Sequence, residues 1–336
     1  MGMLVGNPDI NEVIESPEHP RWPEYQALIK RVFRKYDLAI VTQPSDRAHI
    51  YGLLAAPQRV GIVPTSQSHN WWKKLLSLHT VELDYWNQHV VIERLRLLDE
   101  FDPEIDQESQ VRQPLQVSVT PPAAEPLPQD LIDFVGAGPT VVIHATPMWK
   151  FKRWPIHHWA ELISALVAGG KRVILTGSSS QQDRDLNAQI LAGVRQDSPA
   201  TSLPRVRDCA GQLTLGQTTA LLKLAQLYIG VDTSITHLAA ACGTQTIALF
   251  GATAPPNFGP WPKAVEVSSD LKSVWALRGE GHANGVRTQA AGNVRIIQGP
   301  GGCVPCRKAG CLDKFESHSD CLDQLSARAV MGHLPL

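Results

Sequence analysis

Polar side chains crowd into the segment GVDTSITHLAAACGTQTIALFGAT, residues 230–253. Asp232, Thr233 and Ser234 directly precede an apolar run with helical character, and His237 lies one turn further on. The unpaired N–H groups at a helix start attract anions, and hydroxyl groups add donors, so the segment suits a diphosphate. The Asp232 carboxylate suits sugar hydroxyl groups instead. The structural alternative stays open, because Asp or Thr before a helix is a common N-cap and a histidine inside one is usually packed.

A second polar loop, HATPMWKFKRWP at residues 144–155, lies between a strand-like run and a helix start. Lys150, Lys152 and Arg153 supply its positive charge, and Thr146 can donate a hydrogen bond to the same oxygens. A lysine ammonium is a mobile point charge that suits a phosphate. The alternative is a solvated basic loop. A third loop, residues 176–185, is rich in Gly and Ser but matches neither the dinucleotide nor the Walker pattern.

Four of the six cysteines lie in one short segment, with the spacing C-x2-C-x4-C-x9-C. Cys303, Cys306, Cys311 and Cys321 could close a tetrahedral zinc site of structural type, and His318 could replace one of them. Reduced thiols packed together, or a disulfide pair, are the alternatives. The spacing of plant-type iron–sulfur clusters does not match.

Strands and helices alternate along most of the chain, which predicts an α/β protein with parallel sheets covered on both faces. In such sheets a ligand lies at the carboxyl ends of the strands, where Thr146 and Asp232 fall. We expect an N-terminal domain at 1–119, a Pro-rich linker at 120–130 and a C-terminal domain at 131–336. Clear strands are predicted at 36–42, 59–64, 140–146, 171–177, 227–231 and 244–251, and a long helix at 83–101.

The bulk composition excludes several classes of protein. The 336 residues carry a formal net charge of -1, which argues against non-specific binding of nucleic acid. No apolar run reaches the roughly 18–20 residues of a membrane span, and the first residues do not resemble a secretory signal. We therefore expect a cytoplasmic protein without a nucleic-acid partner.

Several motifs, in order over roughly 140–330, resemble glycosyltransferase family 9, the ADP-heptose–lipopolysaccharide heptosyltransferases. They are VVIHATPMWKFKRWPIHHWAELISAL, VILTGSSSQQ, GVDTSITHLAAACGTQTIALFGAT and the cysteine-rich tail CVPCRKAGCLDKFESHSDCLDQLSARAV. The resemblance implies the GT-B fold, with two Rossmann-like domains facing a cleft and the donor in the C-terminal domain. It also implies inverting transfer of a heptose or similar sugar from an ADP-sugar to a lipopolysaccharide core oligosaccharide, without a catalytic metal or cofactor.

The same resemblance assigns roles to the polar loops. Thr146 and Lys152 would hold the diphosphate, and Asp232, Thr233 and Ser234 would hold phosphate and sugar. Apart from the resemblance, we also expect His237 to belong to the substrate site. Ser234 departs from the glycine that usually follows the Asp-Thr pair. The expected partners are an ADP-sugar and a lipid-linked acceptor, with peripheral contact at the cytoplasmic face of the inner membrane, and the expected state is a monomer.

One departure concerns the general base. The family's first strand and its Gly-Asp loop have no match here, so the N-terminal domain is expected to be incomplete. Asp46 is the carboxylate best placed to substitute as the base. The alternative function is a nucleotide-sugar-binding relative that lacks the base and is catalytically impaired. Residues 268–292 match nothing in the family and are expected to form a flexible loop at the cleft.

Overall fold

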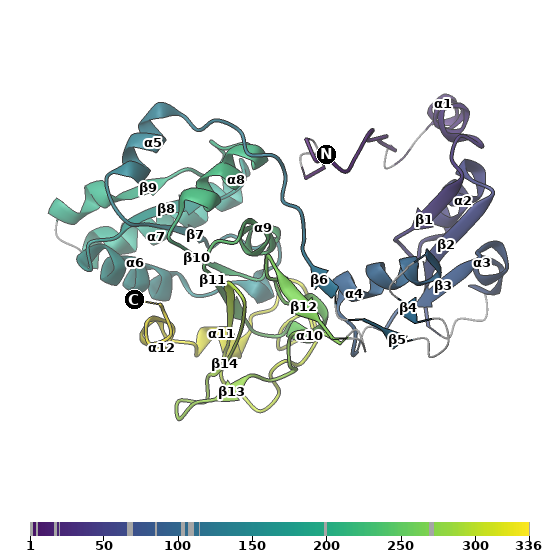
Figure 1. Cartoon of the computed structure of the whole chain (residues 1–336). Helices are drawn as coiled ribbons and strands as arrows, with labels where there is room; N and C mark the ends of the chain where they lie inside the picture. The colour runs from purple at the N-terminus through teal and green to yellow at the C-terminus, as the bar shows by residue number, and fades with distance from the viewer. Residues whose placement is uncertain are drawn as a thin grey trace. The chain divides into compact units, whose positions relative to one another are not determined.

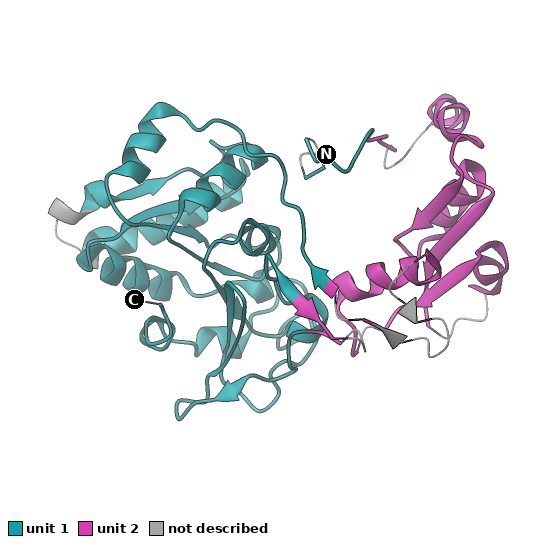
Figure 2. Cartoon of the chain, viewed as in Figure 1, with its two compact units in different colours: residues 1–11, 116–265, 274–336 teal, residues 12–115, 266–273 magenta. Residues whose placement is uncertain are grey.

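The computed structural model describes residues 3–4, 6–16, 19, 21–65, 70–84, 86–101, 105–106, 111–113, 115–197, 200–268 and 272–335. The chain divides into two compact units, shown in different colours in Figure 2. Unit 1 comprises residues 1–11, 116–265 and 274–336, and unit 2 comprises residues 12–115 and 266–273. The domain boundaries expected from the sequence stay predictions. The segment expected to be a linker, residues 120–130, falls within unit 1, and Glu125 N donates to Gly216 O over 3.0 Å.

Unit 1 is built on an eight-stranded sheet within the described residues, in the order β13-β14-β15-β11-β10-β7-β8-β9. The six strands from β15 to β9 run parallel, and β14 and β13 are added antiparallel at one edge. The strands predicted in this half are therefore confirmed. The strand bounds are β7 (Thr140–His144), β8 (Arg172–Thr176), β9 (Val206–Asp208), β10 (Leu227–Val231), β11 (Thr246–Phe250), β13 (Glu280–Gly281), β14 (Arg287–Ala291) and β15 (Val294–Gln298).

Helices cover both faces of this sheet, as Figure 1 shows. Alternate strand residues point to opposite faces, so Val141 and Ile143 pack with α6 and α7, whereas Val142 packs with α5, α8 and α9. α6 begins after Pro155 and ends before Gly169, its C-cap residue. The helix bounds in unit 1 are α5 (Gln129–Gly136), α6 (Ile156–Ala168), α7 (Gln181–Asp197), α8 (Leu215–Leu224), α9 (Ser234–Cys242), α10 (Pro255–Phe258), α11 (Asp320–Asp323) and α12 (Ala327–Met331), with η4 (Ala200–Arg205).

The C-terminal tail is part of the core of unit 1. Leu325, Ala327 and Val330 are fully buried in the same cluster as α6. Trp154, which is 2% exposed, donates from its indole nitrogen to Leu325 O over 2.6 Å. The tail is thereby bonded to the segment that leads into α6.

The insertion at 268–292 is not a flexible loop where the structure describes it, so that expectation was wrong. Strands β13 and β14 extend the sheet, and Trp275 is buried against Phe250 and Ile296. The exposed edge of β15 would otherwise offer unpaired N–H and C=O groups, and β14 pairs with them. Residues 269–271 lie outside the described residues.

Unit 2 contains a three-stranded parallel sheet in the order β1-β2-β3. Val60, Ile62 and Val81 form its core with Leu97. No helix among the described residues of either unit is long and apolar enough to cross a bilayer. The remaining bounds are α1 (Trp22–Val32), β1 (Leu38–Val41), α2 (Asp46–Ala55), β2 (Gln58–Val63), α3 (Trp71–Leu76), β3 (His79–Glu82), α4 (Val90–Leu95), η2 (Arg96–Phe101), β4 (Ile105–Asp106), β5 (Val111–Arg112), β6 (Leu115–Val117) and β12 (Val265–Val267).

The long helix predicted at 83–101 was also wrong. Among the described residues of this segment only α4 is α-helical, and a 3-10 helix, η2, follows it. The Asp84 carboxylate accepts hydrogen bonds from the backbone nitrogens of Trp86 and Asn87, at 2.9 and 3.0 Å. A side chain that bonds its own following backbone favours a turn over a helix, so α4 starts only after His89.

Candidate functional site

A cavity of about 700 Å³ opens in unit 1 where β7, β8 and β10 end. Thr146, Gly177 and Asp232 each follow one of these parallel strands, and all three line the cavity. Lys152, Thr233 and Ser234 line it as well. Five of the six residues predicted to bind substrate therefore lie at one site. His237, the sixth, contacts the site through Asp232.

Lys152 and Asp232 form an ion pair at the centre of this group. The distance from Lys152 Nζ to Asp232 Oδ2 is 2.6 Å, and the aspartate side chain is 8% exposed. Lys152 ends the short 3-10 turn η3 (Lys150–Lys152), which the buried side chain of Phe151 anchors. Lys150 is exposed, so the turn separates one cation that faces solvent from one that faces the cavity.

The neighbours of Asp232 keep its carboxylate ionised. Burial by itself raises the pKa of Asp232, but His237 and the Lys152 ammonium outweigh burial and lower this pKa to about 2. His237 Nε2 lies 3.8 Å from Asp232 Oδ1, and the His237 side chain is 40% exposed. Asp232 is thus an ionised acceptor at neutral pH, although it is almost completely buried.

The start of α9 faces the same cavity. Thr233 occupies the N-cap position with extended backbone, but within the described chain its side chain makes no capping hydrogen bond. Its hydroxyl instead lies 3.3 Å from the Thr236 hydroxyl. The first N–H groups of a helix have no partner inside the helix, and here Thr233, Ser234 and Ile235 present that end to the cavity. This geometry favours an anion site over a purely structural N-cap.

Thr146 belongs to a buried network behind the cavity. His144 Nδ1 lies 2.9 Å from the Thr176 hydroxyl, which itself donates to Ile143 O over 3.2 Å. The Thr146 hydroxyl lies 3.4 Å from His144 Nε2. Burial lowers the pKa of His144 to about 4, so the imidazole is neutral at pH 7 and serves to orient Thr146.

The Gly- and Ser-rich third loop caps its own helix. Ser180 Oγ accepts from Asp183 N over 3.1 Å, and Asp183 Oδ2 accepts from Ser178 N over 2.8 Å. Both serines line the cavity, but their hydroxyl groups bond to one another over 3.0 Å. This loop therefore forms a preorganised wall of the cavity.

Sequence reasoning missed the apolar part of the cavity. Leu215 begins α8 and Leu213 lies two residues before it, and Met148 and Trp149 come from the lysine loop. Met148 is 79% exposed. These side chains could cover a flat, apolar ligand group. Nothing in their local spacing distinguishes them from ordinary surface or core residues.

Asp46, the candidate base, lies in unit 2. It is the first residue of α2, and its Oδ1 lies 2.6 Å from Lys73 Nζ. The Lys73 side chain is only 3% exposed and also donates to Pro44 O over 2.8 Å. The carboxylate of Asp46 therefore compensates a buried positive charge.

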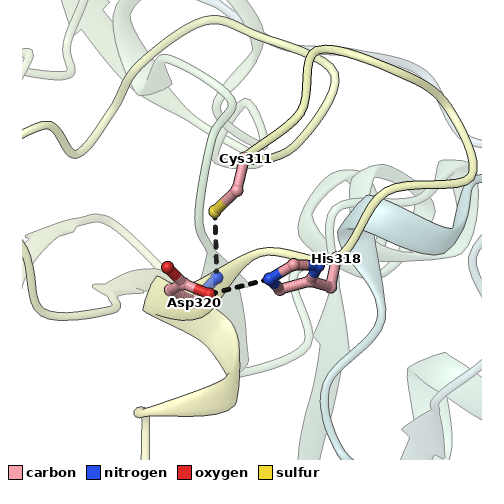
Figure 3. Close-up of side chains that lie close together, drawn as sticks. All are labelled: Cys311, His318 and Asp320. Atoms are coloured by element: carbon pink, nitrogen blue, oxygen red, sulfur yellow. Dashed lines mark hydrogen bonds and ion pairs between the residues drawn. The ribbon is translucent and has the colours of Figure 1, made fainter.

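The cysteine-rich tail brings metal-binding atoms together. Ligand atoms of Cys311, His318 and Asp320 lie within 4.8 Å of one another (Figure 3). Burial, together with the nearby thiols of Cys306, Cys311 and Cys303, raises the pKa of Cys321 to about 12. All four cysteines are free thiols, so the disulfide alternative is not realised. A four-cysteine zinc site stays a prediction.

Several known proteins are similar to this chain in sequence or in structure. Lipopolysaccharide heptosyltransferase 3 of Escherichia coli is 35% identical over 157 residues, which cover 46% of this chain and 42% of that protein. The chain spans less than half the length of the curated relatives it matches. The structure of E. coli ADP-heptose LPS heptosyltransferase II is similar with a TM-score of 0.60 at 20% identity, over 92% of this chain and 78% of that one.

A second solved structure, E. coli heptosyltransferase WaaC with ADP, is similar with a TM-score of 0.57 at 18% identity, over 93% of this chain and 77% of that one. These two likenesses confirm the GT-B fold that the sequence predicted. The model of glycosyltransferase family 9 (heptosyltransferase) matches residues 25–278. Because this match covers most of the chain, and because the polar residues of the family motifs meet at one cavity, the protein belongs to glycosyltransferase family 9.

Proposed function

We propose that this protein transfers a heptose, or a similar sugar, from an ADP-sugar to a lipopolysaccharide core oligosaccharide with inversion. One observation carries the proposal: the ion pair between Lys152 and the buried Asp232 lies beside the open start of α9 in one cavity. A cation and helix N–H groups suit a diphosphate, and an ionised, buried carboxylate suits sugar hydroxyl groups. The names of the relatives, and the ADP in one solved neighbour, support the donor class.

In this proposal the acceptor hydroxyl attacks the anomeric carbon of the donor. A new carbon–oxygen bond forms there as the bond to the β-phosphate oxygen breaks, and ADP leaves. Lys152 and the first N–H groups of α9 stabilise the negative charge that develops on the departing diphosphate. Asp232 accepts hydrogen bonds from the sugar, and a base takes the proton of the acceptor hydroxyl.

Lys152 must divide its charge between Asp232 and the donor. In the structure its ammonium contacts Asp232. A lysine ammonium has three donor hydrogens, so it can keep the carboxylate contact while it binds phosphate oxygens. The ion pair therefore holds Lys152 ready at the cavity without excluding a ligand.

The second candidate function is nucleotide-sugar binding without transfer. The ion pair between Asp46 and Lys73 favours it. Asp46 is the one substitute base that the sequence suggested, and its carboxylate already pairs with a lysine. A carboxylate that compensates a buried lysine is a poor proton acceptor, because protonation would leave the lysine charge unpaired.

Peripheral contact with the inner membrane is also part of the proposal. Helix α3 and the residue two beyond it are inverted with respect to an ordinary surface helix: Trp71, Leu75 and Leu78 are 63%, 73% and 58% exposed, whereas Lys73 is buried. Trp71 and Leu75 lie one helical turn apart on α3, whereas Leu78 follows the helix after Ser77, whose backbone is extended. Exposed Trp and Leu suit the interface of a bilayer that carries a lipid-linked acceptor.

Turnover with a defined donor and acceptor tests the proposal. ADP release should require both ADP-heptose and a lipopolysaccharide core acceptor that lacks the transferred sugar. If calorimetry shows that ADP binds, but no acceptor leads to release of ADP from ADP-heptose, the binding-protein alternative is supported. Failure to bind ADP or ADP-heptose would overturn both functions.

A further inference from the structure

The tail contains a cluster of three different metal-binding groups that the proposed transfer reaction does not use. Cys311 Sγ, His318 and Asp320 contribute one donor atom each, all within 4.8 Å of one another. His318 Nε2 lies 2.9 Å from Asp320 Oδ1, and Asp320 N donates to Cys311 Sγ over 3.3 Å. Figure 3 shows the three side chains converging from the tail.

Backbone hydrogen bonds hold this cluster together. Cys311 N donates to His318 O over 2.9 Å, which closes the loop between the two ligand candidates. Ser317 Oγ accepts from Leu312 N over 3.0 Å and donates to His318 O over 3.1 Å. Gly310 has φ 78°, and a Cβ there would lie 2.6 Å from His318 O. The loop therefore needs glycine at 310, and it presents Cys311 and His318 to each other without help from an ion.

We propose that Cys311, His318 and Asp320 bind a zinc ion, with a neighbouring thiol of the tail as fourth ligand. Zinc accepts sulfur, nitrogen and oxygen ligands together, whereas magnesium and calcium prefer oxygen alone. Four protein ligands leave no open position, so the site is structural. It differs from the four-cysteine site expected from spacing, because His318 and Asp320 supply two of the ligands.

The same loop contacts the turn that carries Lys152. Phe315, between the ligands Cys311 and His318, stacks on Trp149 with 4.3 Å between ring centroids. Ser319, between His318 and Asp320, donates to Phe151 O over 2.6 Å. Zinc would therefore fix the tail against η3 and hold Lys152 in the cavity. This second step rests on the proposed function, because it assumes that Lys152 binds the donor diphosphate.

Metal binding is tested first, on the full chain. The purified protein should bind one equivalent of zinc, and cobalt in its place should give the absorption of a tetrahedral cobalt–thiolate site. Cys311→Ser and His318→Ala should each weaken metal binding at least about 100-fold. His157→Ala, which removes an exposed histidine of α6, is the matched control and should bind as the wild type does. Absence of bound metal, or equal affinity in His318→Ala and His157→Ala, would overturn the site.

The link to Lys152 is tested by ADP affinity with and without zinc. Removal of zinc should weaken ADP binding about fivefold, because one long side chain must then be ordered in each binding event. Phe315→Ala should still bind zinc, and its ADP affinity should no longer respond to zinc. If zinc binds but ADP affinity never responds, the link is wrong and the zinc site stands. If ADP does not bind at all, the proposed function fails, and the zinc measurement is unaffected.

Discussion

Units 1 and 2 each contain a lysine–aspartate ion pair at 2.6 Å, yet the two pairs are buried in opposite senses. In unit 1 the carboxylate of Asp232 is 8% exposed and Lys152 is 24% exposed, so the cation is the partner that reaches the cavity. In unit 2 Lys73 is 3% exposed and Asp46 is 69% exposed, so the anion reaches solvent. The accessible partner of an ion pair can bind a ligand, whereas the buried partner requires a counter-charge.

The largest effect is expected for Lys152→Met, which removes the accessible cation of unit 1. ADP affinity should fall about 30-fold, or ~2 kcal/mol, the value of a charged hydrogen bond. Calorimetric titration with ADP measures this loss, and Lys150→Met provides the control with an exposed lysine two residues away. Equal ADP affinities in the two variants would mean that the Asp232 pair is only structural.

Among the contacts at the site, acid should weaken the ion pair between Lys152 and Asp232 most. Because the pKa of Asp232 is lowered from 3.8 to about 2, the pair stabilises the fold above about pH 4, and this contribution is lost as the pH falls toward 2. The loss should be roughly 2 kcal/mol in the free energy of unfolding. Urea unfolding of the wild type and of Asp232→Asn at about pH 5 and about pH 2.5 measures it. A parallel decline in both proteins would show that Asp232 does not carry this dependence.

Asp46→Asn should destabilise unit 2 by about 1 kcal/mol, because the buried Lys73 ammonium loses its counter-charge. ADP affinity and the rate of ADP release should stay at the wild-type values. Urea unfolding and the two ADP assays measure these quantities. Loss of ADP release with unchanged ADP affinity would instead identify Asp46 as the general base and favour the enzyme over the binding protein.

The smallest effect is expected for Lys73→Met. The carboxylate of Asp46 is already solvated, and an apolar side chain of similar length can replace the buried lysine, so stability should change by less than about 0.5 kcal/mol. Thermal and urea unfolding of Lys73→Met and of Asp46→Asn compare the two losses of stability directly. A larger loss of stability in Lys73→Met than in Asp46→Asn would contradict the expectation that an unpaired buried charge is more destabilising than its removal.

Local sequence predicted the sheet of unit 1 well because its strands are continuous apolar runs. Every residue of β7, from Thr140 to His144, is buried, which is what an apolar run in a parallel sheet requires. Parallel strands end at the same edge, so Thr146 and Asp232 had to lie near each other once the strands were recognised. Prediction failed at 83–101, where Asp84 forms a turn that helical spacing does not reveal, and at 268–292, where the edge of β15 recruits two strands.

Other features depend on contacts between distant segments. Lys152 rather than Lys150 meets Asp232 because Phe151 is buried and sets the direction of the turn. Leu213 and Leu215 join the cavity only through the placement of α8. In the tail, the cysteine spacing pointed to four sulfur atoms, whereas the hydrogen bond from Cys311 N to His318 O brings a histidine and an aspartate to Cys311.

The amino-acid sequence by itself determined the alternation of elements, the family and the set of polar residues at the strand ends, because these depend on local spacing and composition. Only the tertiary structure decided which charge of each ion pair is buried and which reaches a cavity or solvent. The physical reason is that burial depends on what packs around a residue, and that packing comes from segments far apart in the chain.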